Sequence, residues 1–507
     1  MIDRSRTEVP VRGRWGMLTV LCASLLLVAM DATVLNVALP SLIADLQPGA
    51  VAQLWIVDIY GLVLGGLLIT FGAIGDRIGR KRLFLFGFAL FGLASVVAAT
   101  SRVTGQLIGG RVLLAIGGAM VMPSTLSLIR NIFHDPHERT RAIAIWAAIA
   151  GVGAAVGPIV GGLLVEHFGW AAAFWINVPV VLLTLAAGLW LLPEYRAPST
   201  TPFDWVSVPL SVLGIIGFVW GVKHLARGEE VVLNVLVLLA GLALLIWFAR
   251  RQLRLIDPLL DIRLFRRPVF LAAALATLIA MIAIGAALFL ISLWLQYIHG
   301  YSPAGAGLRT APAAVATLVG SLITPALLRR TGVRTVMVGS LVVLAAGFAG
   351  LAISPEPTSY AVIALVLVCL GIGDGIAVTT AAAVLVSSVP PERAGQGGAV
   401  EETSYELGNG LGVALLGSVH GALFTRHMAD VPLTGAQAAT ARESAGGAIA
   451  VAGEIGGDLG DRVHEIAAAA FDSALTVTSY AAAGVVLVVA ILTAILIPRH
   501  TTATARH

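Results

Sequence analysis

The stretch Gly72-Ala-Ile-Gly-Asp76-Arg77-Ile-Gly79-Arg80-Lys81-Arg82 separates two long apolar runs, residues 50–74 and 83–100. A chain crosses the hydrocarbon core of a bilayer as a helix of roughly 20 apolar residues, because lipid offers the backbone no hydrogen-bond partner. The two runs are therefore predicted to be membrane helices, joined by a short basic turn. Part of this turn, Arg77-Ile-Gly79-Arg80, recurs later as Arg330-Thr-Gly332-Val-Arg334.

The composition extends this interpretation to the whole chain. Hydrophobic residues make up 58% of it, charged residues only 12%, and the mean hydropathy is +0.94. A water-soluble domain could not bury that much apolar surface. Apolar runs between polar breaks predict fourteen membrane helices, at residues 15–39, 50–74, 83–100, 105–129, 140–166, 170–193, 204–224, 230–249, 268–296, 305–328, 335–352, 359–388, 396–425 and 471–497.

The distribution of charge predicts the orientation in the membrane. Most of the 32 Lys and Arg residues lie in alternate loops, as in 77–82, 130–141 and 250–267. Because basic loops stay on the cytoplasmic side, both termini are expected in the cytoplasm of a multi-pass inner (plasma) membrane protein. The basic excess is spread over many loops without interleaved aromatic residues, so nucleic acid is not an expected partner. Cys22 and Cys369 fall inside predicted helices, which indicates neither a disulfide framework nor a metal site.

A repeat along the chain predicts the domain organisation. Gly79 and Gly332 are separated by almost the same number of residues as Arg139 and Arg393, each in a similar local sequence. Two such echoes suggest two parallel halves of six helices, as in transporters whose halves rock about a central site. The two surplus helices are expected to form an inserted hairpin. The expected parts are a cytoplasmic N-terminus 1–14, a first half 15–193, the hairpin 204–249, a cytoplasmic linker 250–267, a second half 268–497 and a cytoplasmic tail 498–507.

Acidic residues inside the predicted helices are the first candidates for a site, because an intramembrane charge is costly and rarely faces lipid. Asp31 is central in the first helix, and Asp374 lies mid-helix within a run of glycines. Each is a candidate cation or proton site, and each could instead be a structural carboxyl. Asp58 lies in the outer half of the second helix, where it could also reach the external surface.

The densest group of acids is Glu401, Glu402 and Glu406 in the thirteenth predicted helix. Glu402 and Glu406 are four residues apart, so they share a helix face, and their like charges oppose simultaneous ionisation. This pattern predicts a proton-binding site. The alternative is a hydrated helix start facing the cytoplasm, without a role in coupling.

Two further features of the predicted helices bear on coupling and gating. Arg111, in the fourth helix, requires an anionic or carbonyl partner, and it either couples to the site or only joins two helices. The fifth helix carries Gly151, Gly157 and Pro158, so neighbouring helices can approach it closely and the proline bends it.

These residues together resemble the major facilitator superfamily, and specifically its fourteen-helix drug:proton antiporter family (DHA2). The opening stretch 72–82 resembles the loop motif between the second and third helices, and Asp31-Ala-Thr-Val-Leu-Asn-Val-Ala-Leu-Pro40 resembles the first-helix motif. The run ending Gly157-Pro158-Ile-Val-Gly161-Gly162 is similar to the antiporter motif of the fifth helix, and 258–265 to the segment entering the ninth. The resemblance implies the major facilitator fold over essentially the whole chain.

The segment Ala399-Val-Glu401-Glu402-Thr-Ser-Tyr405-Glu406-Leu-Gly408 is similar to the thirteenth helix of multidrug exporters of the QacA and LfrA type. That similarity implies proton-coupled export of lipophilic cations, such as quaternary ammonium compounds and ethidium, by an all-α membrane protein that is monomeric and needs no cofactor. Asp31 and Asp58 also match acidic positions of that group. The chain departs from it at Leu114-Ala115, where Gln-Gly is usual, and in having no acid between Ala311 and Arg329.

The expected mechanism is competition between protons and drug for shared carboxylates. A hydrophobic cation is best held by a carboxylate among aromatic walls, where cation–π contact adds roughly 0.5–2 kcal/mol. Asp76, Arg77 and Arg80 are expected to form a cytoplasmic latch. Loop 426–470 is expected to form an extracellular helical hairpin, because a structureless loop of that length is uncommon. Candidate wall residues are Trp55, Tyr60, Trp146, Trp175, Phe289 and Tyr405.

Two other functional classes are alternatives to a multidrug exporter. An exporter or importer of one endogenous metabolite or antibiotic would share the fold and the buried acids. A membrane enzyme or receptor would need a catalytic cluster or a phosphate-binding glycine loop, and the sequence contains neither. The nearest histidine pair, His134 and His137, lies in a predicted cytoplasmic loop.

Overall fold

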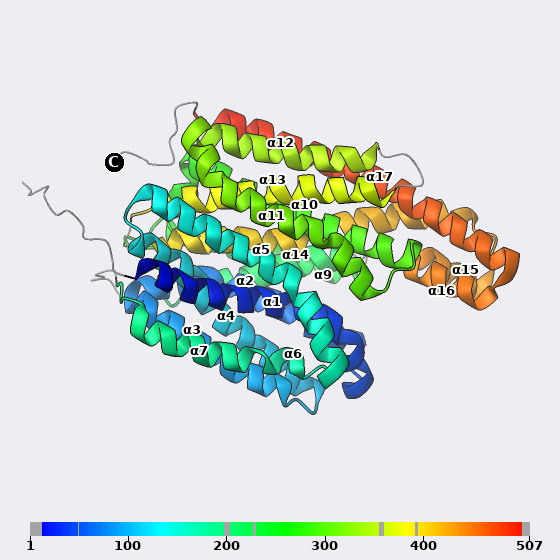
Figure 1. The fold of residues 1–507 in the computed structure, drawn as a ribbon, viewed down its shortest axis with the longest axis horizontal. Helices are drawn as coiled ribbons and strands as arrows, with labels where there is room; N and C mark the ends of the chain where they lie inside the picture. Colours follow the sequence, from blue (N-terminus) through cyan, green and yellow to red (C-terminus); the bar gives the residue numbers. More distant parts are fainter. Residues whose placement is uncertain are drawn as a thin grey trace, which may run out of the picture.

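The described part of this computed structural model is a bundle of long helices. It covers residues 13–48, 50–196, 203–226, 230–353, 359–390 and 394–498, and within these it contains helices and no strands. The long helices run roughly side by side (Figure 1). They are α1 (Arg14–Leu46), α2 (Ala50–Ile78), α3 (Arg80–Ala99), α4 (Thr104–Ile132), α5 (Pro136–Phe168), α7 (Asn177–Leu191), α8 (Ser207–Ala226), α9 (Val231–Gln252), α10 (Pro268–Leu293), α11 (Pro303–Thr331), α12 (Val333–Ala352), α13 (Tyr360–Ser387), α14 (Ala394–His427) and α17 (Gly457–Leu496).

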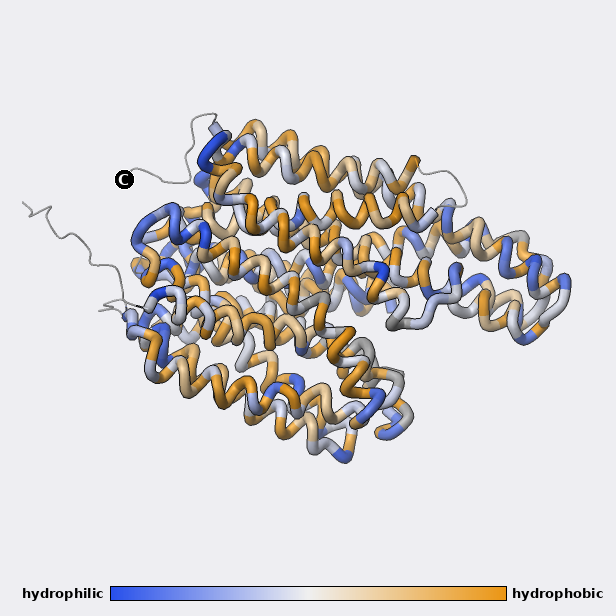
Figure 2. Tube along the Cα trace, in the orientation of Figure 1, coloured by the Kyte–Doolittle hydropathy of each residue, from blue (hydrophilic) through white to orange (hydrophobic). Residues whose placement is uncertain are grey.

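The helix lengths confirm a multi-span membrane protein. Thirteen helices of the described chain are long and apolar enough to cross a membrane. Helix α5, with 33 residues, lies among them as a further long helix, so the fourteen predicted spans each find a counterpart. Hydrophobic residues follow the lengths of these helices, and hydrophilic residues gather toward the two ends of the bundle (Figure 2).

The shorter helices cap the bundle or break its spans. Helix α6 (Ala172–Trp175) precedes α7 within one predicted span, and α10 continues as the π-helix η2 (Trp294–Ile298). The segment 426–470, expected to be helical, holds η4 (Met428–Asp430), α15 (Gly435–Glu443), α16 (Ala445–Ile455) and the first turns of α17. Helices α15 and α16 project beyond one end of the bundle, here called the far end (Figure 1). The opposite end carries the α2–α3 turn and is called the basic end.

The repeat seen in the sequence has a structural counterpart. Gly79 lies between the end of α2 and the start of α3, and Gly332 lies between α11 and α12 in the same way. Both glycines have positive φ, 117° and 82°, a conformation that costs glycine little because it lacks a Cβ. The second pair of the repeat cannot be compared, since Arg393 lies outside the described residues.

Buried hydrophobic residues form two core clusters. The first comprises residues of α1–α7 and is joined by Ala382, Ala383 and Val386 of α13. The second comprises residues of the C-terminal helices and of α8, together with Phe248 of α9 and Leu62, Ile69 and Ala73 of α2. Helix α8 packs on α2, where Gly66 faces Val212 of α8, and it also contacts α14, so α8 lies against both of these helices.

Candidate functional site

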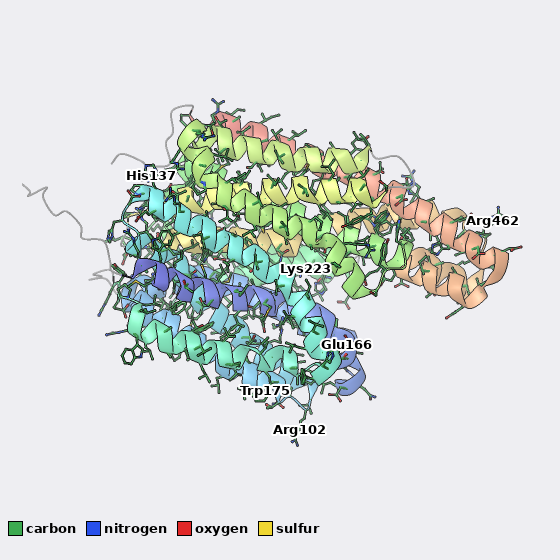
Figure 3. The ribbon with its side chains drawn as sticks, viewed as in Figure 1. Arg102, His137, Glu166, Trp175, Lys223 and Arg462 are labelled. Carbon is green, nitrogen blue, oxygen red and sulfur yellow. The ribbon has the colours of Figure 1, made fainter. Side chains whose placement is uncertain are left out.

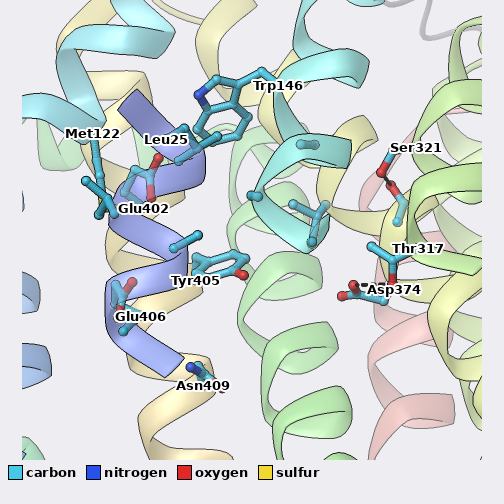
Figure 4. A pocket seen from close by; sticks show the side chains of 18 of the residues that line it. Leu25, Met122, Trp146, Thr317, Ser321, Asp374, Glu402, Tyr405, Glu406 and Asn409 are labelled. Carbon is cyan, nitrogen blue, oxygen red and sulfur yellow. Dashed lines mark hydrogen bonds between the residues drawn. The ribbon is translucent and has the colours of Figure 1, made fainter. Parts of the chain in front are cut away.

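A central cavity of about 90 Å³ lies between the two core clusters. Residues of α1, α2, α4 and α5 line one side, and residues of α11, α13 and α14 line the other. Figure 4 shows this arrangement, with Tyr405 of α14 between the carboxyls of that helix and Asp374. A ligand in the cavity would therefore touch helices from distant parts of the sequence.

Three carboxyls line this cavity: Asp374, Glu402 and Glu406. Asp374 is 5% exposed and Glu402 is 1% exposed. The Thr317 hydroxyl donates to Asp374 Oδ2 at 3.4 Å, whereas Asp374 Oδ1 and Glu402 Oε1 have no hydrogen-bond partner among the described residues. No Lys or Arg lines the cavity in the described part of the chain, so its charge, when the carboxyls are ionised, is negative.

Helical geometry explains which residues of α14 reach the cavity. Glu402, Tyr405, Glu406 and Asn409 are spaced at three and four residues and therefore lie on one face. Glu401 points off this face. It is completely buried, does not line the cavity, and neither of its carboxylate oxygens has a partner among the described residues.

The aromatic candidates divide into two groups. Tyr60, Trp146 and Tyr405 line the cavity, and Trp146 Nε1 donates to the Thr125 hydroxyl at 3.0 Å, which fixes the indole.

The other three aromatic candidates are not cavity residues. Trp55 stacks on Trp220 of α8 at 4.7 Å between ring centroids. Trp175 is 45% exposed on the outer side of the bundle (Figure 3), and Phe289 is 38% exposed. The structure thus brings half of the expected wall residues together.

Asp31 is not a cavity residue and instead forms a buried ion pair. Arg111 Nη1 donates to Asp31 Oδ2 at 3.1 Å, and Asn177 Nδ2 donates to Asp31 Oδ1 at 2.9 Å. The Arg111 guanidinium also lies over the ring of Tyr60, 4.5 Å from its centroid. Tyr60 lines the cavity, so one side chain connects the ion pair to the site.

Helices α1 and α5 cross closely where the sequence carries its glycines. A Cβ on Gly157 would meet the Thr33 hydroxyl of α1 and would lie 3.0 Å from the Met30 carbonyl oxygen. A Cβ on Gly153 would lie 2.8 Å from Ala29 Cβ. The side chains of Asp58 and Pro158 lie outside the described residues.

The latch residues lie at the basic end. Asp76 accepts a hydrogen bond from Arg80, whose Nη2 also donates to the Gly72 carbonyl at 2.7 Å. Arg77 pairs with Asp257 of the linker at 2.8 Å. The turn following α2 is thus held by its own helix and by the segment between α9 and α10.

The cavity is closed toward the basic end. Every residue of α14 from Ala394 to Thr403 is buried. A Cβ on Gly72 of α2 would lie 2.7 Å from Ala399 Cβ, so these two helices touch without space between them. Asn409, farther along α14, is exposed and lines the cavity, so the cavity is less covered on its far side.

Several cavity residues were not singled out from the sequence. Thr317 and Ser321 are small polar residues spaced four apart in α11, a signal that could have indicated an inward face. Asn409 continues the spacing of the α14 acids. Arg309, the second basic residue within an apolar span, lies against the Tyr301 ring at 3.7 Å, which explains its position without the cavity.

Comparisons with known proteins agree with this architecture. The model of the Major Facilitator Superfamily matches residues 21–413. Multidrug efflux pump LfrA of Mycolicibacterium smegmatis is 43% identical over 488 residues, 96% of each chain. Methyl viologen resistance protein SmvA of Salmonella typhimurium is 35% identical over 480 residues, 94% of this chain and 97% of the relative. The solved structure of the human organic anion transporter MFSD10 shares the fold, with a TM-score of 0.65 at 14% identity over 95% of this chain and 99% of that one.

Proposed function

Because the chain belongs to the major facilitator superfamily and to its fourteen-helix drug-exporter branch, we propose that it expels lipophilic cations in exchange for protons. Quaternary ammonium compounds and cationic dyes such as ethidium are the proposed substrates. The relatives are drug-efflux and drug-resistance proteins, and methyl viologen, which names one of them, is itself an organic cation.

One observation carries this proposal: Asp374, Glu402 and Glu406 share a cavity that no described basic residue lines. An organic cation entering it would gain attraction to carboxylates and contact with Tyr60, Trp146 and Tyr405. A carboxyl that carries a proton no longer attracts the cation. Protons and drug therefore exclude each other, which is the requirement for exchange through one site.

The direction of transport follows from the two ends of the bundle. We propose that the basic end faces the cytoplasm, in keeping with the excess of basic residues in its loops. The structure then has the site closed to the cytoplasm. Opening requires the α2–α14 contact at Gly72 and Ala399 to part, together with the ion pair between Arg77 and Asp257. We retain the division into halves 15–193 and 268–497, the hairpin 204–249 and a monomeric state as parts of the proposal.

The test is ethidium efflux by the full chain in proteoliposomes with an imposed pH gradient. We expect gradient-dependent transport that a protonophore abolishes. Glu402→Gln and Glu406→Gln should each lower the rate by about tenfold or more, equivalent to roughly 1.4 kcal/mol. Glu465→Gln is the matched control, because Glu465 is exposed on α17 away from the cavity.

Other outcomes would contradict the proposal in distinct ways. Transport that persists without a pH gradient would exclude proton coupling. Undiminished ethidium efflux in both cavity variants would remove these carboxyls from the mechanism. If the wild type moved no cationic dye but transported one uncharged metabolite or antibiotic, its function would instead be the export of that single compound.

A further inference from the structure

The base of the α8–α9 hairpin, at the basic end, presents a cluster of cations. Arg250 and Arg254 are exposed and lie four residues apart where α9 ends. Arg263 is also exposed, and its Nη2 donates at 2.8 Å to the carbonyl of Leu253, the residue before Arg254. The side chains of Arg250 and Arg254 make no hydrogen bond or ion pair with any described residue.

The acidic residues nearest in sequence are already engaged. Asp204 accepts two hydrogen bonds from Arg251, at 3.0 and 2.8 Å, and Asp257 pairs with Arg77. Asp261 caps the 3-10 helix η1 (Ile262–Arg266) by accepting from the Arg263 backbone N–H at 3.1 Å. None of these carboxylates forms an ion pair with Arg250, Arg254 or Arg263, so the three guanidinium groups remain available to a ligand.

Apolar side chains mark the depth of this cluster in the bilayer. Trp205 before α8 and Trp247 in the last turns of α9 are 69% and 59% exposed. Exposed tryptophans at helix ends are typical of the headgroup level of a membrane. Ile256, two residues beyond Arg254, is 90% exposed, and such an isoleucine is favourable where the interface rather than water covers it. Along the rest of α9, toward the far end, exposed apolar residues such as Val232, Leu236 and Leu239 would face lipid.

We propose that this surface, the hairpin base formed by Trp205, Trp247, Arg250, Arg254, Ile256 and Arg263, binds the headgroup of an anionic phospholipid. Guanidinium groups match phosphate oxygens in geometry and charge, and three of them that form no ion pair with a described carboxylate suit a headgroup that carries net negative charge. Basic residues next to a membrane helix attract anionic lipids in this way. The bound lipid would lie beside the linker that pairs with Arg77.

The test measures lipid selectivity of the full chain in phosphatidylcholine bilayers. Trace spin-labelled phosphatidylglycerol or phosphatidylcholine reports the fraction of each lipid that the protein immobilises. We expect wild type to prefer phosphatidylglycerol, less so at high salt. Arg250→Gln/Arg254→Gln/Arg263→Gln should lower that preference by about fivefold or more, and the triple Lys variant should retain part of it. The control carries Arg102→Gln/Arg426→Gln/Arg462→Gln at the far end, where Figure 3 shows Arg102 and Arg462.

Three results would overturn the proposal: no preference in wild type, an undiminished preference in the Gln variant, or an equal loss in the far-end control. Inorganic phosphate separates a lipid site from a small-anion site. If phosphate abolished the preference where sodium chloride of equal ionic strength did not, the cluster would bind free anions instead. Size-exclusion chromatography checks folding, and Arg250→Gln/Arg254→Gln, which leaves the Arg263–Leu253 bond intact, replaces the triple variant if that one misfolds. The measurement requires no transport, so its failure leaves the proposed export function unaffected.

Discussion

Arg111 donates a hydrogen bond to Asp31 at 3.1 Å, and each side chain is only 2% exposed. The pair joins α4 to α1 inside the first half, behind Tyr60 of the cavity wall. Removing one partner of a buried pair leaves an uncompensated charge, whereas removing both replaces it by apolar contact. Asp31 therefore lies in a buried ion pair, apart from the acids that line the cavity.

We therefore expect Asp31→Leu and Arg111→Met each to destabilise the protein by about 3–5 kcal/mol, and the double variant Asp31→Leu/Arg111→Met to recover much of that loss. Thermal unfolding of the purified protein in detergent provides the measurement. A double-mutant cycle built on the same singles isolates the pair interaction. Additive losses in the double variant would show that the two side chains do not depend on each other.

The crossing of α1 and α5 predicts a steric effect at Gly157. A larger side chain there must displace the Thr33 hydroxyl and approach the Met30 carbonyl, so the two helices have to separate. Gly157→Val is expected to cost about 1–3 kcal/mol of stability and to lower dye transport, because α1 and α5 both line the cavity. Gly109→Val, at a position with no heavy atom near a Cβ, should leave both unchanged. Equal melting temperatures for the two variants would contradict this account.

Much of the fold was predictable because each membrane helix is a local pattern. The spans follow from apolar length alone, and α10 begins at the residue expected, Pro268. Helix α17 begins at Gly457 rather than near 471, because its first turns are amphipathic and pack on α16 instead of crossing lipid. Hydropathy does not detect such an extension.

The site was predictable only in part, because membership of the cavity depends on helices distant in sequence. The spacing of Glu402 and Glu406 placed them on one face, and they do share the cavity. Nothing in the local sequence distinguishes Asp31, paired behind the wall, from Asp374, which lies in it. That difference arises from Arg111 and Asn177, contributed by two other helices. Likewise, Trp175 and Tyr60 both lie in predicted membrane helices, but Tyr60 is buried and Trp175 is exposed.

Asp204, just before α8, is expected to make a pH-dependent contribution to the stability of the protein. It lies outside the membrane-spanning helices. Hydrogen bonds from Arg251 hold the pKa of the Asp204 carboxyl below its usual value. A lowered folded-state pKa stabilises the protein above the unfolded-state value near 3.8, and that stabilisation is lost as pH falls through the folded-state pKa. Asp204→Asn should therefore lower the unfolding temperature at pH 7, and the difference from wild type should shrink as the pH falls below the unfolded-state value. A decrease that stays the same as the pH falls would indicate a loss of packing instead of charge.

The closed basic end predicts that one glycine of α14 controls access to the cavity. A Cβ on Gly395 would collide with the Arg80 guanidinium, which is held by Asp76 and the Gly72 carbonyl. Gly395→Val should therefore push α14 from α2 and favour the state open at the basic end. In a variant that lacks Cys22 and Cys369, the thiol introduced in the cavity by Thr317→Cys should then react faster with a membrane-impermeant thiol reagent applied from that end. Gly421→Val on the same helix, where a Cβ meets open space, is the control and should leave the rate unchanged.

A steric push worth about 1.4 kcal/mol would raise the fraction of open molecules, and hence the labelling rate, about tenfold. Slower labelling in Gly395→Val would mean that this contact is not the barrier on the basic side.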